Sequence, residues 1–171
     1  MRALPRTTDI LMAVVRFAHI VSAILWIGAL GFSVMVLRPA ISRVGMPSRK
    51  DTLKQLIPIV GRFIPGTGIA TIVFGTLLYL LMGNFDPSIL WGTMWGLILF
   101  TALLLALGLL GFGLVVVIRA SKKLLGHLNE ESYTHGPEVG ALQQAFNRGQ
   151  VVALVWGFGI LALMVVATGA L

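Results

Sequence analysis

The sequence predicts an all-α integral membrane protein, a four-helix bundle with antiparallel up-down topology. Of its 171 residues, 57% are hydrophobic and only 11% are charged. The apolar residues gather in four segments, each close to or above the length of about 20 residues that crosses a bilayer. Because four spans leave little chain for a soluble domain, we expect a single membrane domain over residues 1–171.

The first expected span covers about residues 10–37 and ends at the basic stretch that begins with Arg38. The second span covers about residues 63–85, and the sequence NFDP after it predicts a tight turn. Such a short connection makes the second and third spans an antiparallel hairpin.

The third expected span, about residues 89–118, contains no charge and is longer than the hydrocarbon core requires, which implies tilt or an interfacial extension. Trp91 and Trp95 near its start are expected at the outer membrane interface. Gly92 and Gly96 form a GxxxG pair, a pattern that favours close helix approach.

The fourth expected span covers about residues 151–171, so the connections at about residues 38–62 and 119–150 lie on one side of the membrane. Short cytoplasmic loops carry an excess of Lys and Arg. These two connections hold ten of the 13 basic residues, namely Arg38, Arg43, Arg49, Lys50, Lys54, Arg62, Arg119, Lys122, Lys123 and Arg148. The opposite side holds Arg2, Arg6 and Arg16. We therefore expect cytoplasmic loops, with both termini outside, in the cell (inner) membrane.

The net charge of +7 does not predict nucleic-acid binding, because the positive-inside bias and contact with anionic lipid account for it. The expected partners are the lipid bilayer and either membrane proteins or further copies of the chain. All six acidic residues fall outside the spans or at their ends, which disfavours ion-coupled transport and hard-metal sites. The absence of cysteine excludes disulfides and thiolate metal sites.

His19, inside the first span, is the main candidate functional residue, because ionisable groups within a membrane are costly and often functional. Arg16 precedes it by one helical turn, and Trp26 follows two turns later on the same face. A neutral imidazole is a good axial ligand for haem iron. Arg16, near the outer surface, would then pair with a haem propionate.

A thioether can serve as the second axial ligand of such a haem. Given the directions of the spans, we expect Tyr79, Met82, Met94 and Met164 at a depth comparable to that of His19. A second His19, from a neighbouring copy of the chain, is the other candidate ligand.

Two further interpretations of His19 stay open. One is a core histidine hydrogen-bonded to a serine or a backbone carbonyl of another helix, with Ser22 and Thr71 as typical polar contacts. The other is a copper site, for which His and Met are suitable soft ligands. Arg16 has an alternative of its own, since it can snorkel to the outer headgroups.

Three stretches, HIVSAILWIGALGF, RFIPGTGIATIVFGTLLYL and WGTMWGLILF, resemble the first three spans of the four-helix unit of the copper-resistance protein D family. That superfamily also contains a haem-binding bacterial protoporphyrinogen oxidase. The resemblance extends from His19 to about Leu110 and rests on the H-I-x5-W-x-G spacing and on Arg62-Phe63. It implies a connection to b-type haem or copper. The family often has a lysine in the third span, where residues 97–100 are apolar here, and the sequence does not predict oxidase activity for this chain.

We therefore expect a small membrane b-type haem protein in electron transfer, acting as a subunit or homo-oligomer rather than as an enzyme by itself. A cofactor-free structural accessory subunit of a larger membrane complex is one alternative, and a copper-handling membrane protein is another. The expected cofactor-binding residues are His19 as axial ligand, Arg16 at the propionate, and Trp26, Met94 and Met164 in the pocket or as second ligand. His19 is also the metal ligand in the copper alternative.

Overall fold

The computed structural model describes residues 7–129 and 137–169, and the regular elements within them are all helices. In chain order these are α1 (Thr7–Phe32), η1 (Ser33–Leu37), α2 (Arg38–Ser42), α3 (Met46–Met82), α4 (Pro87–Gly92), α5 (Met94–Phe112), η2 (Gly113–Val117), α6 (Ile118–Asn129) and α7 (Pro137–Thr168). The two short η elements are π-helical turns that continue directly into the α-helices on either side.

Four stretches of this helical chain are long and apolar enough to cross a membrane: Thr8–Ser42, Ser48–Met82, Met94–Lys123 and Gln144–Thr168. This confirms the prediction of an all-α chain with four potential spans. The helices also continue beyond the apolar segments, since residues 43–45 alone separate α2 from α3. Most of the expected connection at residues 38–62 is therefore helical. Most of its basic residues lie in the helical turns that continue the spans. Arg2 and Arg6 lie outside the described residues.

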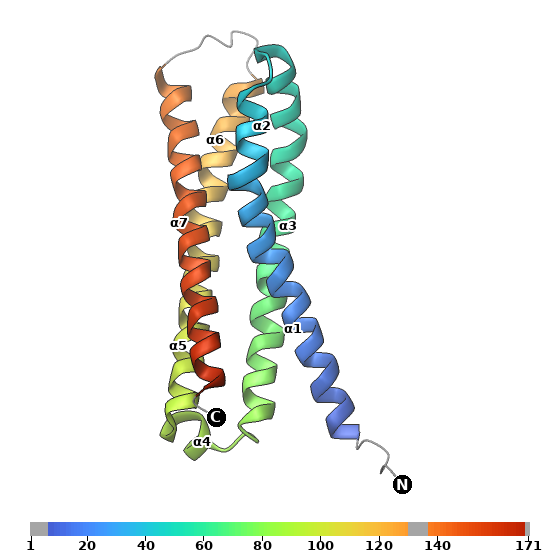
Figure 1. The fold of residues 1–171 in the computed structure, drawn as a ribbon. Coiled ribbons are helices and arrows are strands. Elements are labelled where there is room, and N and C mark those ends of the chain that lie inside the picture. The colour runs from blue at the N-terminus through green and yellow to red at the C-terminus, as the bar shows by residue number, and fades with distance from the viewer. Residues whose placement is uncertain (1–6, 130–136, 170–171) are drawn as a thin grey trace.

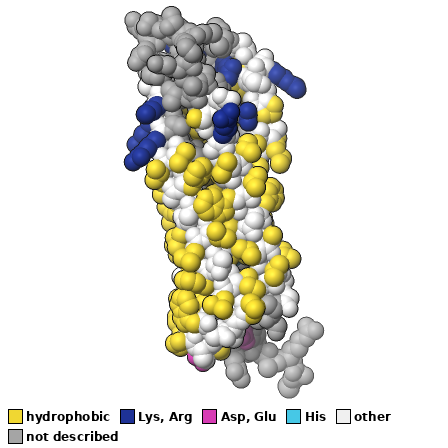
Figure 2. Space-filling model, turned by 90° about the vertical axis from the view of Figure 1, so that its left-hand side faces the viewer, with side chains coloured by type: hydrophobic (Ala, Val, Ile, Leu, Met, Phe, Trp, Pro, Cys, Tyr) yellow, Lys and Arg dark blue, Asp and Glu magenta, His cyan; other side chains and the backbone are white. Residues whose placement is uncertain are grey.

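The four long helices lie side by side, with the start of α1 and the end of α7 at the same end of the molecule (Figure 1). α1 packs along α3 and α5 along α7, while α3 also meets α5 and α1 meets α7. Lys and Arg side chains gather toward one end of the molecule, and hydrophobic side chains cover much of the remaining length (Figure 2). Phe17, Ile24 and Val155 are each at least 65% exposed, as expected of side chains that lipid solvates.

The third span differs from the continuous helix expected over residues 89–118. α4 and α5 are separate helices because Thr93, between them, is extended, with φ −108° and ψ 151°. The Thr93 hydroxyl donates a hydrogen bond of 2.7 Å to the Ile89 carbonyl and accepts one of 3.0 Å from the Gly96 N–H. A single side chain thus caps the end of one helix and the start of the next.

The break at Thr93 decides which side chains face the bundle interior. In a continuous helix Trp91 and Trp95 would share one face, but Trp91 is 51% exposed and Trp95 only 6%. A side chain at Gly96 would collide with carbonyl groups of α4, whereas the space around Gly92 is open. Gly96 alone therefore lets α5 turn closely against α4, and Trp95 is buried inside the bundle.

Candidate cofactor site

His19 on α1 is 9% exposed and directed toward α3, where its Nδ1 lies 3.0 Å from the backbone carbonyl oxygen of Thr71. A carbonyl can only accept a hydrogen bond, so Nδ1 donates and carries a proton. In the neutral imidazole Nε2 then keeps its lone pair. This contact is the bond to a carbonyl of another helix that the core-histidine interpretation describes, while the Ser22 hydroxyl donates to the His19 carbonyl instead of contacting the ring.

Two glycines on α3 make room for the large side chains of α1. A Cβ built on Gly75 would lie 2.8 Å from Cε1 of His19, and one built on Gly68 would lie 2.8 Å from the Trp26 indole. Both distances are shorter than real Cβ contacts, so each ring occupies space that only a glycine leaves free. The seven-residue spacing of His19 and Trp26 matches that of their glycine partners on the antiparallel helix, which brings α1 and α3 close along two turns.

A cavity of about 410 Å³ adjoins His19 and is bounded by α1, α3, α5 and α7. This volume falls within the range of about 300–1,000 Å³ that is typical of ligand and cofactor pockets. Most of the lining side chains are apolar. Those with coordination chemistry, charge or an aromatic ring are Arg16, His19, Trp26, Tyr79, Met82, Trp95 and Met164.

The structure brings together four of the five residues that the sequence predicts for this site. His19, Arg16, Trp26 and Met164 all line the cavity, and the exposed Arg16 lies at its rim. Met94 is 70% exposed and does not line the cavity. Met94 is the first residue of α5, directly after the break that turns Trp95 inward. Its side chain therefore points away from the bundle interior, whatever its depth along the helix.

Three cavity features were missed by sequence reasoning. Gly68 and Gly75 shape the space for the two rings, and Trp95 forms part of the wall. The glycines had a signal in the sequence, because their spacing repeats that of His19 and Trp26. Trp95 had none, because its burial depends on the extended conformation of Thr93.

Among the described residues, no three His, Cys, Asp or Glu side chains lie close enough together to hold a metal ion. No family model matches the chain, and no curated protein or solved structure does.

Proposed function

We propose that the chain holds one b-type haem in the cavity beside His19 and serves in electron transfer, as a subunit of a larger membrane complex or as a homo-oligomer. The observation that carries the proposal is the 3.0 Å contact between His19 Nδ1 and the Thr71 carbonyl, inside a potential span and beside a cavity. Metal-binding histidines almost always donate their other ring N–H to a carbonyl, a carboxylate or water. His19 is held in that way, with Nε2 left for iron.

The donor set around the cavity fits haem. His19 would hold the iron through Nε2, and Arg16 at the rim would pair with a propionate. Met82 and Met164 also line the cavity, and either thioether would be a candidate for a second protein ligand to the iron. Bound haem would supply one-electron redox chemistry. The apolar walls, including Trp26, would exclude water from it.

We also propose that the spans form an antiparallel up-down bundle in the cell (inner) membrane with both termini outside. The gathering of Lys and Arg toward one end of the molecule supports a cytoplasmic location for that end (Figure 2). Membership of the copper-resistance protein D family is part of the same proposal. His19 and Trp26, which carry much of that resemblance, both line the cavity.

Two alternatives make different use of the same residues. The hydrogen bond that joins α1 to α3 through His19 is also what a cofactor-free accessory subunit would need for helix association. His19 with Met82 or Met164 would be a soft ligand set for copper.

A visible spectrum of the purified protein, with metal analysis of the same sample, separates these functions. The haem proposal predicts a Soret band that shifts on reduction with dithionite and one iron per chain. Copper without a Soret band would favour the copper-handling alternative. A colourless, metal-free protein that purifies with other membrane subunits would favour the accessory role.

A further inference from the structure

In the described part of the chain, the cavity beside His19 opens between α1 and α7. The lining residues from α3 and α5 are all buried or half-buried, and the exposed lining residues all belong to α1 and α7. These exposed residues are Arg16, Ile20, Leu161 and Thr168. Side chains that line a cavity and are also exposed mark the place where the cavity reaches the surface of the protein.

The opening follows from the way in which α1 and α7 diverge. The two helices meet at Gly157, where an added Cβ would lie 2.6 Å from Cδ1 of Ile27, and at Gly31, where it would lie 3.9 Å from Cδ1 of Leu154. From there toward the start of α1 and the end of α7 the two helices separate (Figure 1). The other three sides of the cavity are closed, because α3 packs against α1, α5 against α3, and α7 against α5.

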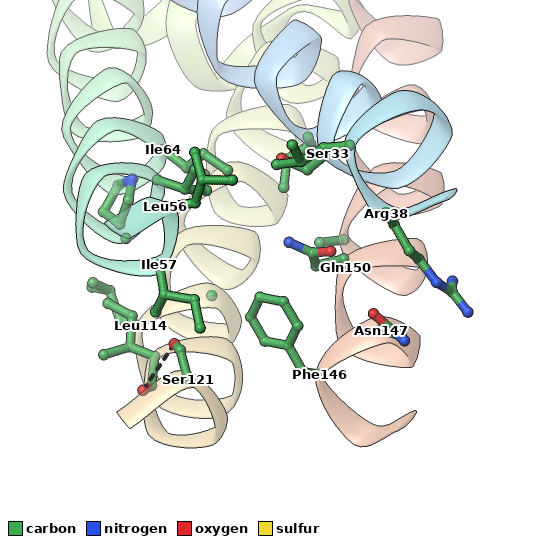
Figure 3. Close-up of a pocket in the computed structure, with 18 of the residues that line it drawn as sticks. Ser33, Arg38, Leu56, Ile57, Ile64, Leu114, Ser121, Phe146, Asn147 and Gln150 are labelled. Atoms are coloured by element: carbon green, nitrogen blue, oxygen red, sulfur yellow. Dashed lines mark hydrogen bonds between the residues drawn. The ribbon is translucent and has the colours of Figure 1, made fainter. Parts of the chain in front are cut away.

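Buried side chains also close both ends of the cavity. Toward the turn before α4 lies a cluster of side chains that are each at most 8% exposed, namely Tyr79, Leu90, Trp95 and Ala167. At the other end Trp26, which is 4% exposed, borders both this cavity and a smaller one of about 120 Å³. Figure 3 shows this smaller cavity, with Ser33 and Gln150 in its wall. Neither end therefore offers a path as open as the side between α1 and α7.

The opening faces the interior of the bilayer. Ile20 and Leu161 lie within potential membrane spans and are 49% and 36% exposed. Arg16 lies one turn nearer to the start of α1 than Ile20, and Thr168 is the last residue of α7. The opening thus has apolar edges, with polar side chains toward the end of the molecule where α1 begins and α7 ends.

Such an opening suits a flat, lipid-soluble ligand that carries negative charge along one edge. Haem b has this form, because its macrocycle is apolar and both propionates project from the same edge. We propose that Ile20 and Leu161 flank a lateral entrance through which the chain takes up its haem from the bilayer, with Arg16 attracting the propionates. This inference rests on the proposed function, which states only what the cavity holds and not how the cavity is filled.

The test compares the kinetics of haem binding in variants that narrow the entrance. Apoprotein from cells that cannot make haem is reconstituted into phosphatidylcholine vesicles, and the Soret band is followed after haemin is added. Release is followed after excess haem-free vesicles are added to the loaded protein. We expect Ile20→Trp and Leu161→Trp to slow uptake and release by the same factor, roughly tenfold, because a larger side chain at an entrance raises the barrier in both directions and leaves the affinity unchanged.

The matched control variants are Ile24→Trp and Val165→Trp. Ile24 and Val165 lie one turn from Ile20 and Leu161, are 65% and 70% exposed, and do not line the cavity. Both controls should take up haem at the rate of the parent protein. Protein that is loaded with haem during synthesis should have the same visible spectrum in the parent and in all four variants, which shows that the site itself is intact.

Equal rates of uptake in the parent and in the folded entrance variants would overturn the inference, while a Soret band in the loaded protein would still support the proposed function. A weaker affinity with an unchanged rate of uptake would also overturn it, because the two side chains would then belong to the binding wall. A parent protein that takes up no haem would contradict the proposed function and the haem entrance with it. If one entrance variant does not fold, the other decides the question.

Discussion

The imidazole of His19 occupies space that Gly75 leaves open on the facing helix. A Cβ at Gly75 would lie 2.8 Å from Cε1 and 3.0 Å from Nδ1 of the ring. The hydrogen bond from His19 to the Thr71 carbonyl depends on this approach, since both partners of the ring lie on α3 one turn apart. The position of the candidate ligand is thus set by a residue that has no side chain.

Gly75→Ala should therefore displace the His19 ring. We expect a loss of about 1–3 kcal/mol in stability, typical of an overpacked site, and weaker retention of any bound pigment. Gly66→Ala, on the same helix but with open space around its Cβ position, is the matched control and should be neutral or stabilising by up to about 1 kcal/mol. Thermal unfolding in detergent measures both effects. Equal unfolding temperatures of the two variants would show that the contact between α1 and α3 adjusts to the added methyl group without loss of stability.

Tyr79→Phe should destabilise the break between α4 and α5. The Tyr79 hydroxyl donates a 2.8 Å hydrogen bond to the Leu90 carbonyl in the last turn of α4, and both residues are buried. Its removal leaves a buried carbonyl without this donor, at a cost of about 1–3 kcal/mol. Thr101→Val removes an exposed hydroxyl that bonds only within its own helix and should change little. A melting temperature that falls no further for Tyr79→Phe than for Thr101→Val would contradict this role.

The turn before α4 should give the protein an acid-sensitive contribution to stability. Asp86 caps α4 by accepting hydrogen bonds of 2.8 Å from the backbone N–H and the hydroxyl of Ser88, and these bonds lower the pKa of the Asp86 carboxyl. Because the folded pKa lies below the unfolded one, the contribution is present at neutral pH and is lost as the pH falls through the folded pKa. The difference in melting temperature between the parent and Asp86→Ala should shrink over that range. A difference in melting temperature that does not change with pH would show that the ionised Asp86 carboxylate does not stabilise the turn.

The orientation in the membrane can be tested because the chain has no cysteine. Ser48, near the start of α3, and Ser88, beside the turn before α4, are exposed and lie at opposite ends of α3 and its hairpin. The proposed topology predicts that an impermeant thiol reagent added to intact cells labels Ser88→Cys and spares Ser48→Cys. The reverse pattern would invert the topology.

Much of this architecture could be predicted from the sequence, because its signals are local. Apolar length predicts the four spans, and an ionisable residue inside a span singles out His19 whatever surrounds it. Three of the other four predicted site residues, Arg16, Trp26 and Met164, do line the cavity.

The features that could not be predicted are local breaks in the helices, which the hydrophobic pattern of each span does not reveal. One extended residue, Thr93, changes the rotation of α5, so that Trp95 is buried and Met94 is exposed. Two π-helical turns, η1 and η2, also interrupt the long helices, and the hydrophobic pattern gives no signal for them.

The measurement that tests the central claim most directly is the visible spectrum, oxidised and dithionite-reduced, of the parent and of folded His19→Ala. The account predicts a Soret band in the parent that is lost, or readily removed, in His19→Ala, because the apolar walls and any thioether must then hold the cofactor without the imidazole. Met94→Leu should keep the parent spectrum, since that side chain is exposed outside the cavity. An unchanged Soret band in folded His19→Ala, or a parent protein with no Soret band, would contradict the assignment of His19 as a haem ligand.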